Sequence, residues 1–442
     1  MAGGAWTVQN KVRPGVYINI KSQGKPQGAA GTRGTVTMPV VLGWGPEKTP
    51  VEVDFETNFE KVLGYPITDS ALILLREALK RVNKVILYRV NAGGVKAAAT
   101  IGGINFTAKY TGTRGNQIAG SVKQNIDDTT KFDVSTYLNG KEVDRQTVAA
   151  ISELKFNDYV DFSGSGSIAA AAGTSLTNGA NGTAVAADYA DYFTAIEPLN
   201  FNTMALPVDD AEIKAVTVAF IKRMREQEGK KVQAVLANYP AADSEGILSV
   251  KNGVILSSGT VIDKVKATAW VAGAVAGAEV SQSLTYSAYD DAVDVDTRFT
   301  NSQIETALRS GELVFVENQG RAIVEQEINT FVSFTPEKGK EFSKNRVVRL
   351  FDSIENDIRD IFASFYIGKV SNNDDGRNLF KSELINYLNR LQAIGAIQNL
   401  DPQEDIKVLP GTDIDSVVVN LHIQPVDAIE KIYITVTVGG EQ

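Results

Sequence analysis

The histidine and cysteine content of the chain limits the chemistry that it can perform. His422 is the only histidine, and there is no cysteine. A serine–histidine–aspartate triad needs a histidine base, while multi-histidine metal sites, thiolate zinc sites and cysteine nucleophiles need residues that this chain lacks or holds only once. Apolar and polar residues alternate from Val417 to Gln424, and His422 falls among the polar ones. We therefore expect His422 on the polar face of a strand.

Two glycine-rich stretches and one acidic run could in principle bind a ligand. Gly112–Asn116 and Ser163–Ser167 lack the lysine and hydroxyl of a P-loop and the helix context of a dinucleotide site, so we interpret both as turns. Asp290–Asp296 lacks the glycine and terminal glutamate of an EF-hand and is expected to be a solvated loop. Paired carboxylates for glycoside hydrolysis are not excluded, but nothing favours them. We predict no catalytic, cofactor-binding or metal site, and no enzyme.

Chain length, net charge and apolar segments limit the number of domains and the kinds of partner. A chain of 442 residues predicts two to four domains, and a net charge of -9 argues against a nucleic-acid partner. The most apolar stretch, Ala267–Val280, is too short to cross a bilayer and contains Glu279, so we expect a buried element and no membrane contact. The N-terminus lacks the apolar run of a signal peptide.

Residues 1–92 are predicted to form an arm followed by a small α/β region. A short strand after Arg13-Pro14-Gly15 precedes a loop, a buried strand from Val36 to Gly45 and a helix capped by Asp69 or Ser70. A second buried strand covers Val85–Val90. Strand, helix and strand in this order indicate an α/β unit.

Residues 93–182 are predicted to form a β-sandwich inserted into the chain. Strands are expected at Phe132–Leu138 and Tyr159–Phe162, among many Gly, Asn, Thr and Ser residues. Asn139-Gly140 between two alternating segments predicts a hairpin.

Residues 183–335 alternate helices with apolar strands, which predicts a mostly parallel sheet. Asp209 and Glu212 form an expected capping box for a helix with Val216 on its apolar stripe. Further elements are a strand at Val232–Ala237, a helix at Asn301–Arg309 and a strand at Glu312–Glu317. In residues 336–442 we expect two long helices, the first with its apolar face from Val347 to Phe365, and two closing strands, Ser416–Gln424 and Lys431–Val438.

Each end of the chain carries an alternating strand whose backbone groups need a partner. Such a strand pairs within its own chain or adds to a sheet of a neighbouring molecule. We name the two candidate intersubunit segments the N-arm and the C-arm. The N-arm residues are Pro14, Gly15, Val16, Tyr17, Ile18 and Ile20, and the C-arm residues are Ile432, Tyr433, Ile434, Val436 and Val438.

Several segments, in order along the chain, resemble contractile phage tail sheath proteins, in particular those of Gram-positive myophages and defective prophage tails. These segments are Lys11–Ile18, Val40–Pro46, Ala108–Asn116, Leu176–Gly182 and the glycine–alanine run Ala267–Val280. The resemblance implies an α+β multidomain fold: an N-terminal region (1–92), a β-sandwich (93–182), a non-catalytic subtilisin-like α/β domain (183–335) and a tube-facing C-terminal domain (336–442).

The resemblance also implies a function and partners. Hexameric rings of this chain would stack helically around a tail tube protein, linked by strand exchange of the N- and C-arms, and would contract in a virion tail assembled in the host cytoplasm. Baseplate and tail terminator proteins would be further partners, with no cofactor. We predict that charged residues of the helix expected at 342–369 contact the tube. These residues are Lys344, Arg346, Arg349 and Arg359. A tail-like bacteriocin sheath, an α/β hydrolase and a surface adhesion protein are the alternatives.

Overall fold

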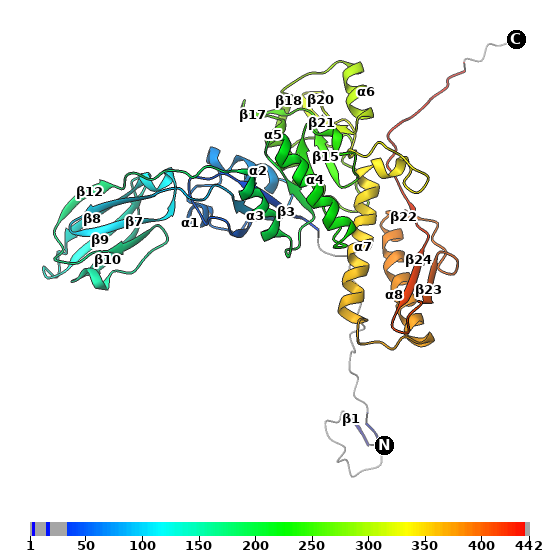
Figure 1. The fold of residues 1–442 in the computed structure, drawn as a ribbon, viewed down its shortest axis with the longest axis horizontal. Helices are drawn as coiled ribbons and strands as arrows, with labels where there is room; N and C mark the ends of the chain where they lie inside the picture. Colours follow the sequence, from blue (N-terminus) through cyan, green and yellow to red (C-terminus); the bar gives the residue numbers. More distant parts are fainter. Residues whose placement is uncertain (1, 5–14, 18–32, 438–442) are drawn as a thin grey trace. The chain divides into compact units, whose positions relative to one another are not determined.

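The computed structural model describes residues 2–4, 15–17 and 33–437 (Figure 1). Two short parallel strands, β1 (Ala2–Gly4) and β2 (Gly15–Tyr17), pair with each other. The remaining described residues fall into two compact units, one of 33–356 with 425–437 and one of 357–424. We call the first of these the body and the second the C-terminal unit.

A seven-stranded sheet forms the centre of the body, in the order β19-β15-β14-β13-β3-β5-β4. All neighbours pair in parallel except the edge strand β4, which is antiparallel to β5. Every residue of β14 and β15 is buried, as expected where helices cover both faces. The strands are β3 (Thr35–Val40), β4 (Pro50–Asp54), β5 (Lys84–Arg89), β13 (Thr203–Ala205), β14 (Gln233–Ala237), β15 (Ile247–Val250) and β19 (Glu312–Leu313).

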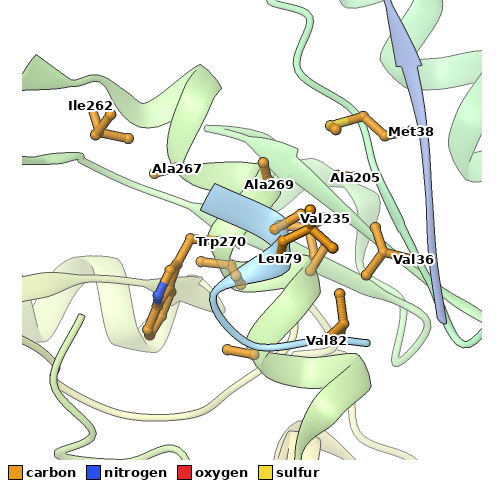
Figure 2. Close-up of a cluster of buried hydrophobic side chains, with 14 of the residues drawn as sticks. Val36, Met38, Leu79, Val82, Ala205, Val235, Ile262, Ala267, Ala269 and Trp270 are labelled. Atoms are coloured by element: carbon orange, nitrogen blue, oxygen red, sulfur yellow. The ribbon is translucent and has the colours of Figure 1, made fainter. Parts of the chain in front are cut away.

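Alternate residues of these strands enter two separate hydrophobic clusters, as strand geometry requires. In β14, Val235 joins the cluster that contains α2 (Ile73–Leu79) and α5 (Lys264–Gly277), and Leu236 joins the cluster that contains α3 (Ala186–Ile196) and α4 (Ala211–Glu226). Figure 2 shows the first cluster, with Trp270 of α5 near Leu79 of α2. The predicted apolar segment Ala267–Val280 is therefore mostly a buried helix.

Residues 96–175 form a β-sandwich of two sheets, β10-β9-β8-β12 and β11-β7-β6. Its core includes Ile104, Phe106 and Val160. Asn139 and Gly140 connect β9 to β10 with φ of 52° and 78°, which confirms the predicted hairpin. The elements are β6 (Lys96–Ile101), β7 (Ile104–Thr111), η2 (Thr113–Gln117), β8 (Ile118–Gln124), β9 (Phe132–Leu138), β10 (Lys141–Val148), η3 (Ile151–Glu153), β11 (Val160–Ser163) and β12 (Ala171–Ser175).

Smaller elements complete the body. A three-stranded sheet has the order β17-β16-β18, and β20 pairs with β21. Their bounds are α1 (Phe59–Leu63), η1 (Ser70–Leu72), η4 (Pro240–Ala242), β16 (Val254–Leu256), β17 (Val261–Ile262), β18 (Ala292–Val295), α6 (Asn301–Arg309), β20 (Phe315–Asn318), β21 (Arg321–Val324) and η5 (Lys340–Ser343).

Helix α7 (Asn345–Phe365) begins in the body and ends in the C-terminal unit, and α8 (Asp374–Ala393) follows it. Within the C-terminal unit, the Tyr387 hydroxyl donates to the Asp357 carboxylate at 2.7 Å and the Phe362 and Phe380 rings lie 5.3 Å apart. The strands here are β22 (Ile397–Gln398), β23 (Ile406–Pro410), β24 (Val417–Leu421) and β25 (Gln424–Pro425), with β23 and β24 forming an antiparallel hairpin.

The α+β multidomain class with an inserted β-sandwich is confirmed, but several local predictions need correction. The cap of α4 is Asp210, which accepts from the Ile213 backbone, because Asp209 instead pairs with Lys214. Val216 is 47% exposed and does not belong to the apolar face of that helix. The strand predicted at Glu312–Glu317 is divided into β19 and β20, which join different sheets.

The predicted N-terminal α/β region and the predicted α/β domain at 183–335 share one sheet. β3 pairs with β13, with Val36 opposite Thr203, so the chain leaves the central sheet for the sandwich and then returns to it. The sequence pattern shows each strand but not its long-range neighbour.

Candidate functional site

His422, whose side chain type is suited to acid–base chemistry, lies at the surface directly after a strand. His422 is exposed and follows β24, with its backbone N–H donated to Asp405. Over residues 33–437 no cluster of three or more acidic or histidine side chains could hold a metal ion. No helix in this part of the chain has the length and apolar character needed to span a bilayer.

The glycine-rich turn at 112–116 lies at the junction of the sandwich and the central sheet. Gly112 has φ of 123°, and a Cβ there would lie 2.2 Å from the Gly43 carbonyl oxygen, so the chains approach too closely for any side chain. Arg114 is buried, donates to the Gly64 carbonyl oxygen at 2.7 Å and lies 4.6 Å from the Tyr65 ring centre. This turn fastens two parts of the fold together.

The C-arm is the most unusual surface of the body. Residues 431–437 form no strand and no helix, and the side chains of Ile432, Tyr433, Ile434 and Val436 are 75% to 90% exposed. Figure 1 draws the segment as an extended trace without a strand arrow. The strand predicted at Lys431–Val438 is therefore not formed within the described chain, and Val438 lies outside the described residues. Four large apolar side chains at alternating or adjacent positions are rarely left in water without a partner.

Glu430, two residues before Ile432 of the C-arm, is held by three side chains of the body. The Glu430 carboxylate accepts from the Thr285 hydroxyl at 2.9 Å, from the Gln326 amide at 2.5 Å and from the Lys344 ammonium group. Burial would raise the pKa of Glu430, but the hydrogen bonds from Lys344 and Gln326 outweigh burial and hold the pKa below its ordinary value. The sequence prediction missed this residue because a single Glu carries no periodic pattern.

The N-arm lies only partly within the described residues. Gly15, Val16 and Tyr17 form β2, which pairs in parallel with β1, while Pro14, Ile18 and Ile20 lie outside the described residues. An intersubunit role for either arm stays a prediction.

The charged residues predicted to face a tube have different surroundings. Arg349 is 0% exposed, donates to the Glu327 carboxylate at 2.5 Å and also donates to the Gln282 carbonyl oxygen, so in this conformation it cannot touch a second protein. Arg346 is also buried, and burial lowers the pKa of its guanidinium group. Lys344 binds Glu430, whereas Arg359 is partly exposed and pairs with Asp360.

The polar residues of the first half of α7 instead fix this helix to the body. Arg225 of α4 donates two hydrogen bonds of 2.8 Å to the Asp352 carboxylate, and both side chains are buried. Asn356 exchanges hydrogen bonds with the backbone of Lys231 at 3.0 and 2.9 Å. We call Asn345, Arg349, Asp352 and Asn356 the polar face of α7; their spacing of three or four residues is readable in the sequence and indicates one helix face.

Family models of phage tail sheath proteins match almost the whole described body and C-terminal unit. The tail sheath protein Gp18 domain III N-terminal region matches residues 33–90 and the phage tail sheath β-sandwich domain matches 92–181. The phage tail sheath central domain matches 182–330 and the phage tail sheath C-terminal domain matches 337–439.

Individual relatives agree over their full length. The protein YqbK of Bacillus subtilis is 42% identical, covering 99% of this chain and 100% of the relative, and the phage-like element PBSX protein XkdK of the same organism is 40% identical over the same shares. Among solved structures, a sheath tail protein of Desulfitobacterium hafniense is 52% identical with a TM-score of 0.87, covering 95% of this chain and 99% of that one. A sheath tail protein of Listeria innocua is 38% identical with a TM-score of 0.80, covering 92% and 95%.

The family models and the solved structures that the chain matches are those of structural proteins, with the same α+β multidomain fold. The chain belongs to the phage tail sheath protein family. It is a structural component of a phage-type tail and not an enzyme, as the sequence predicted.

Proposed function

We propose that this chain is the repeating subunit of a contractile sheath, in which hexameric rings stack helically around a tail tube and shorten to drive the tube through a host envelope. Neighbouring subunits are linked by strand exchange of the N-arm and the C-arm. A tail tube protein, a baseplate and a tail terminator are the other partners, and assembly occurs in the host cytoplasm.

The exposed C-arm is the observation that carries this proposal. Its backbone and its apolar side chains find no strand partner among the described residues of the same chain. If the C-arm adds as a strand to the sheet of a neighbour, its backbone groups form hydrogen bonds and its apolar side chains are buried. About five main-chain hydrogen bonds contribute roughly 2 to 7 kcal/mol before side-chain burial. The hairpin β23–β24 has two strands only, so each has an edge that no described strand covers.

Contraction needs two lattices of one subunit and a barrier between them, without a nucleotide. The fold suits this proposal because its described residues form two compact units. Two solved sheaths described as being in a contracted state, from the anti-feeding prophage and from an extracellular contractile injection system, share the fold at 14% and 13% identity with TM-scores of 0.58 and 0.53. Strand pairing through the arms keeps neighbours joined while the lattice changes.

The tube contact must break during contraction, so we propose that it is polar and weak. Arg359, which is partly exposed on α7, is the candidate that remains after the burial of Arg346 and Arg349. An exposed ion pair is worth little in water, which suits a contact that has to be released.

Negative-stain electron microscopy of the purified full chain tests the proposal. We expect hollow, ridged cylinders from concentrated protein, with or without added tube protein. Removing residues 1–20 should leave soluble, folded subunits that form no cylinders. Normal cylinders from that truncated chain would contradict strand exchange by the N-arm, and the absence of cylinders from the full chain even with tube protein would contradict the sheath assignment.

A further inference from the structure

The segment that leads into the C-arm buries a charge and exposes its apolar residues. The Glu430 side chain is 11% exposed, whereas Ile429 and Ile432 on either side are 88% and 75% exposed. A terminal segment that packed for stability alone would do the opposite, because apolar surface gains from burial and a carboxylate loses its hydration. The burial of Glu430 therefore needs a reason other than core packing.

Three elements of the body converge on this carboxylate. Thr285 lies in the segment before β18, Gln326 follows β21 and Lys344 comes directly before α7. Each donates to Glu430, so both carboxylate oxygens accept hydrogen bonds from side chains of the body. We call these three donors the cradle.

The cradle continues into the buried interior. The Thr285 hydroxyl that donates to Glu430 also accepts from the Glu327 backbone N–H at 3.0 Å. The Glu327 carboxylate in turn accepts from the Leu284 backbone at 2.8 Å and from the buried Arg349 of α7. The Thr285 donor is therefore connected through Glu327 to the buried Arg349, so this side of the cradle is fixed to the interior of the body.

We propose that Glu430 is a positioning residue that anchors the root of the C-arm in this cradle, so that each arm reaches its neighbour from a fixed point of the body. The inference rests on the proposed exchange of the C-arm and adds to it the residue that sets where the arm departs. Release of Glu430 frees five more residues, 426–430, which lengthen the tether and lower the effective concentration of the arm at its acceptor.

Trypsin gives a direct measurement on the unassembled full chain. Lys431 is the last lysine or arginine of the sequence, so cleavage there releases residues 432–442 as one peptide that mass spectrometry can quantify. The protease must take an extended segment on both sides of Lys431, including Glu430, into its cleft. The rate of release therefore follows the population in which Glu430 has left the cradle.

Lys344→Gln is the main variant, because it removes the charged donor and leaves the sequence around Lys431 unchanged. Loss of a hydrogen bond to a charged group predicts a release rate roughly tenfold or more above that of the wild type. Lys344→Arg, which keeps the charge, should restore slow release. Lys340→Gln is the matched control: it removes an equal charge from the preceding turn, has no contact with Glu430 and should leave the rate unchanged.

Assembly of the same variants tests the positioning role. The critical concentration for tube formation, measured by sedimentation, should rise at least about twofold for Lys344→Gln and not for Lys340→Gln. An unchanged trypsin rate for Lys344→Gln would overturn the anchor. Faster release with an unchanged critical concentration would overturn positioning and leave the proposed function intact. Normal tubes after deletion of residues 431–442 would instead overturn exchange of the C-arm itself.

Discussion

Gly277 allows α5 to lie directly against the backbone that follows α2. A Cβ at this position would lie 1.9 Å from the Arg81 carbonyl oxygen, which no side chain can accommodate without moving one helix. We expect Gly277→Ala to lower the free energy of unfolding by about 1–3 kcal/mol, measured by urea denaturation. Gly173→Ala in β12 is the control, because nothing lies within 4 Å of the added carbon. Equal stability of the two variants would show that the helices can separate freely.

Glu430 gives the stability of the chain a defined pH dependence. Its pKa in the folded chain lies below the ordinary value of 4.5, so its charged form is stabilised by folding. This contribution is fully present above pH 4.5 and is lost as the pH falls through the lowered pKa. The difference in unfolding free energy between wild type and Glu430→Gln should therefore be constant near neutral pH and shrink in acid.

The Glu430 carboxylate contacts the Lys344 ammonium group and interacts electrostatically with the Arg346 guanidinium, which also interacts with Asp427. Urea denaturation at a series of pH values measures the difference. Asp427→Asn serves as the control, because Asp427 is more exposed and lies 3.8 Å from Lys344. A difference that persisted unchanged in strong acid would show that Glu430 acts by shape and not by charge.

At the scale of elements, the polar face of α7 fixes the first half of this helix to the body. Asp352 and Arg225 form a buried pair, so removing one partner leaves a charge without compensation. We expect Asp352→Ala to cost about 3–5 kcal/mol in urea unfolding. Asp360→Ala, about two turns further along the helix and at a 70% exposed side chain, should stay within about 0.5 kcal/mol of the wild type. Similar effects for both would contradict anchoring of α7 through its first half.

Elements with strong local signals were predicted from the sequence almost to the residue. Helix α6 has the predicted bounds, because a Thr300–Gln303 capping box begins it and Gly311 follows it. Strand β9 and the hairpin after it were also predicted, because the Asn139-Gly140 pair is a strong local turn signal. The cap of α4 was misplaced by one residue because two adjacent aspartates offer equal local chemistry, and only the distant Lys264 and nearby Lys214 distinguish them.

The candidate contact residues were less predictable, because sequence shows a charge but not its partner. Arg349 was expected to face another protein, yet its partner Glu327 lies 22 positions away and buries it. The C-arm could be found from its alternation, while its anchor could not, since Thr285 and Gln326 are far from Glu430 in sequence. Long-range pairing is the information that a local pattern lacks.

At the scale of the whole molecule, the proposed function assigns stability to the body and assembly to the C-arm. The described C-arm side chains are exposed, so deletion of residues 431–442 should shift the midpoint of thermal unfolding by less than about 2 °C. The same deletion should abolish tubes in electron micrographs, because it removes the proposed intersubunit strand.

A second experiment on the C-arm keeps its length and replaces the side chains on one face. In an extended strand Ile432, Ile434 and Val436 lie on one side and Thr435 and Thr437 on the other. Replacing the three apolar residues by serine should leave a folded monomer that forms no tubes at any accessible concentration, because main-chain hydrogen bonds without side-chain burial do not offset the ordering of the arm. Serine at Thr435 and Thr437 should leave tube formation within about threefold of the wild-type critical concentration, since those side chains stay small and polar. Equal assembly of both variants would mean that the backbone alone joins the subunits, and equal failure would mean that both faces of the C-arm are buried in the neighbour.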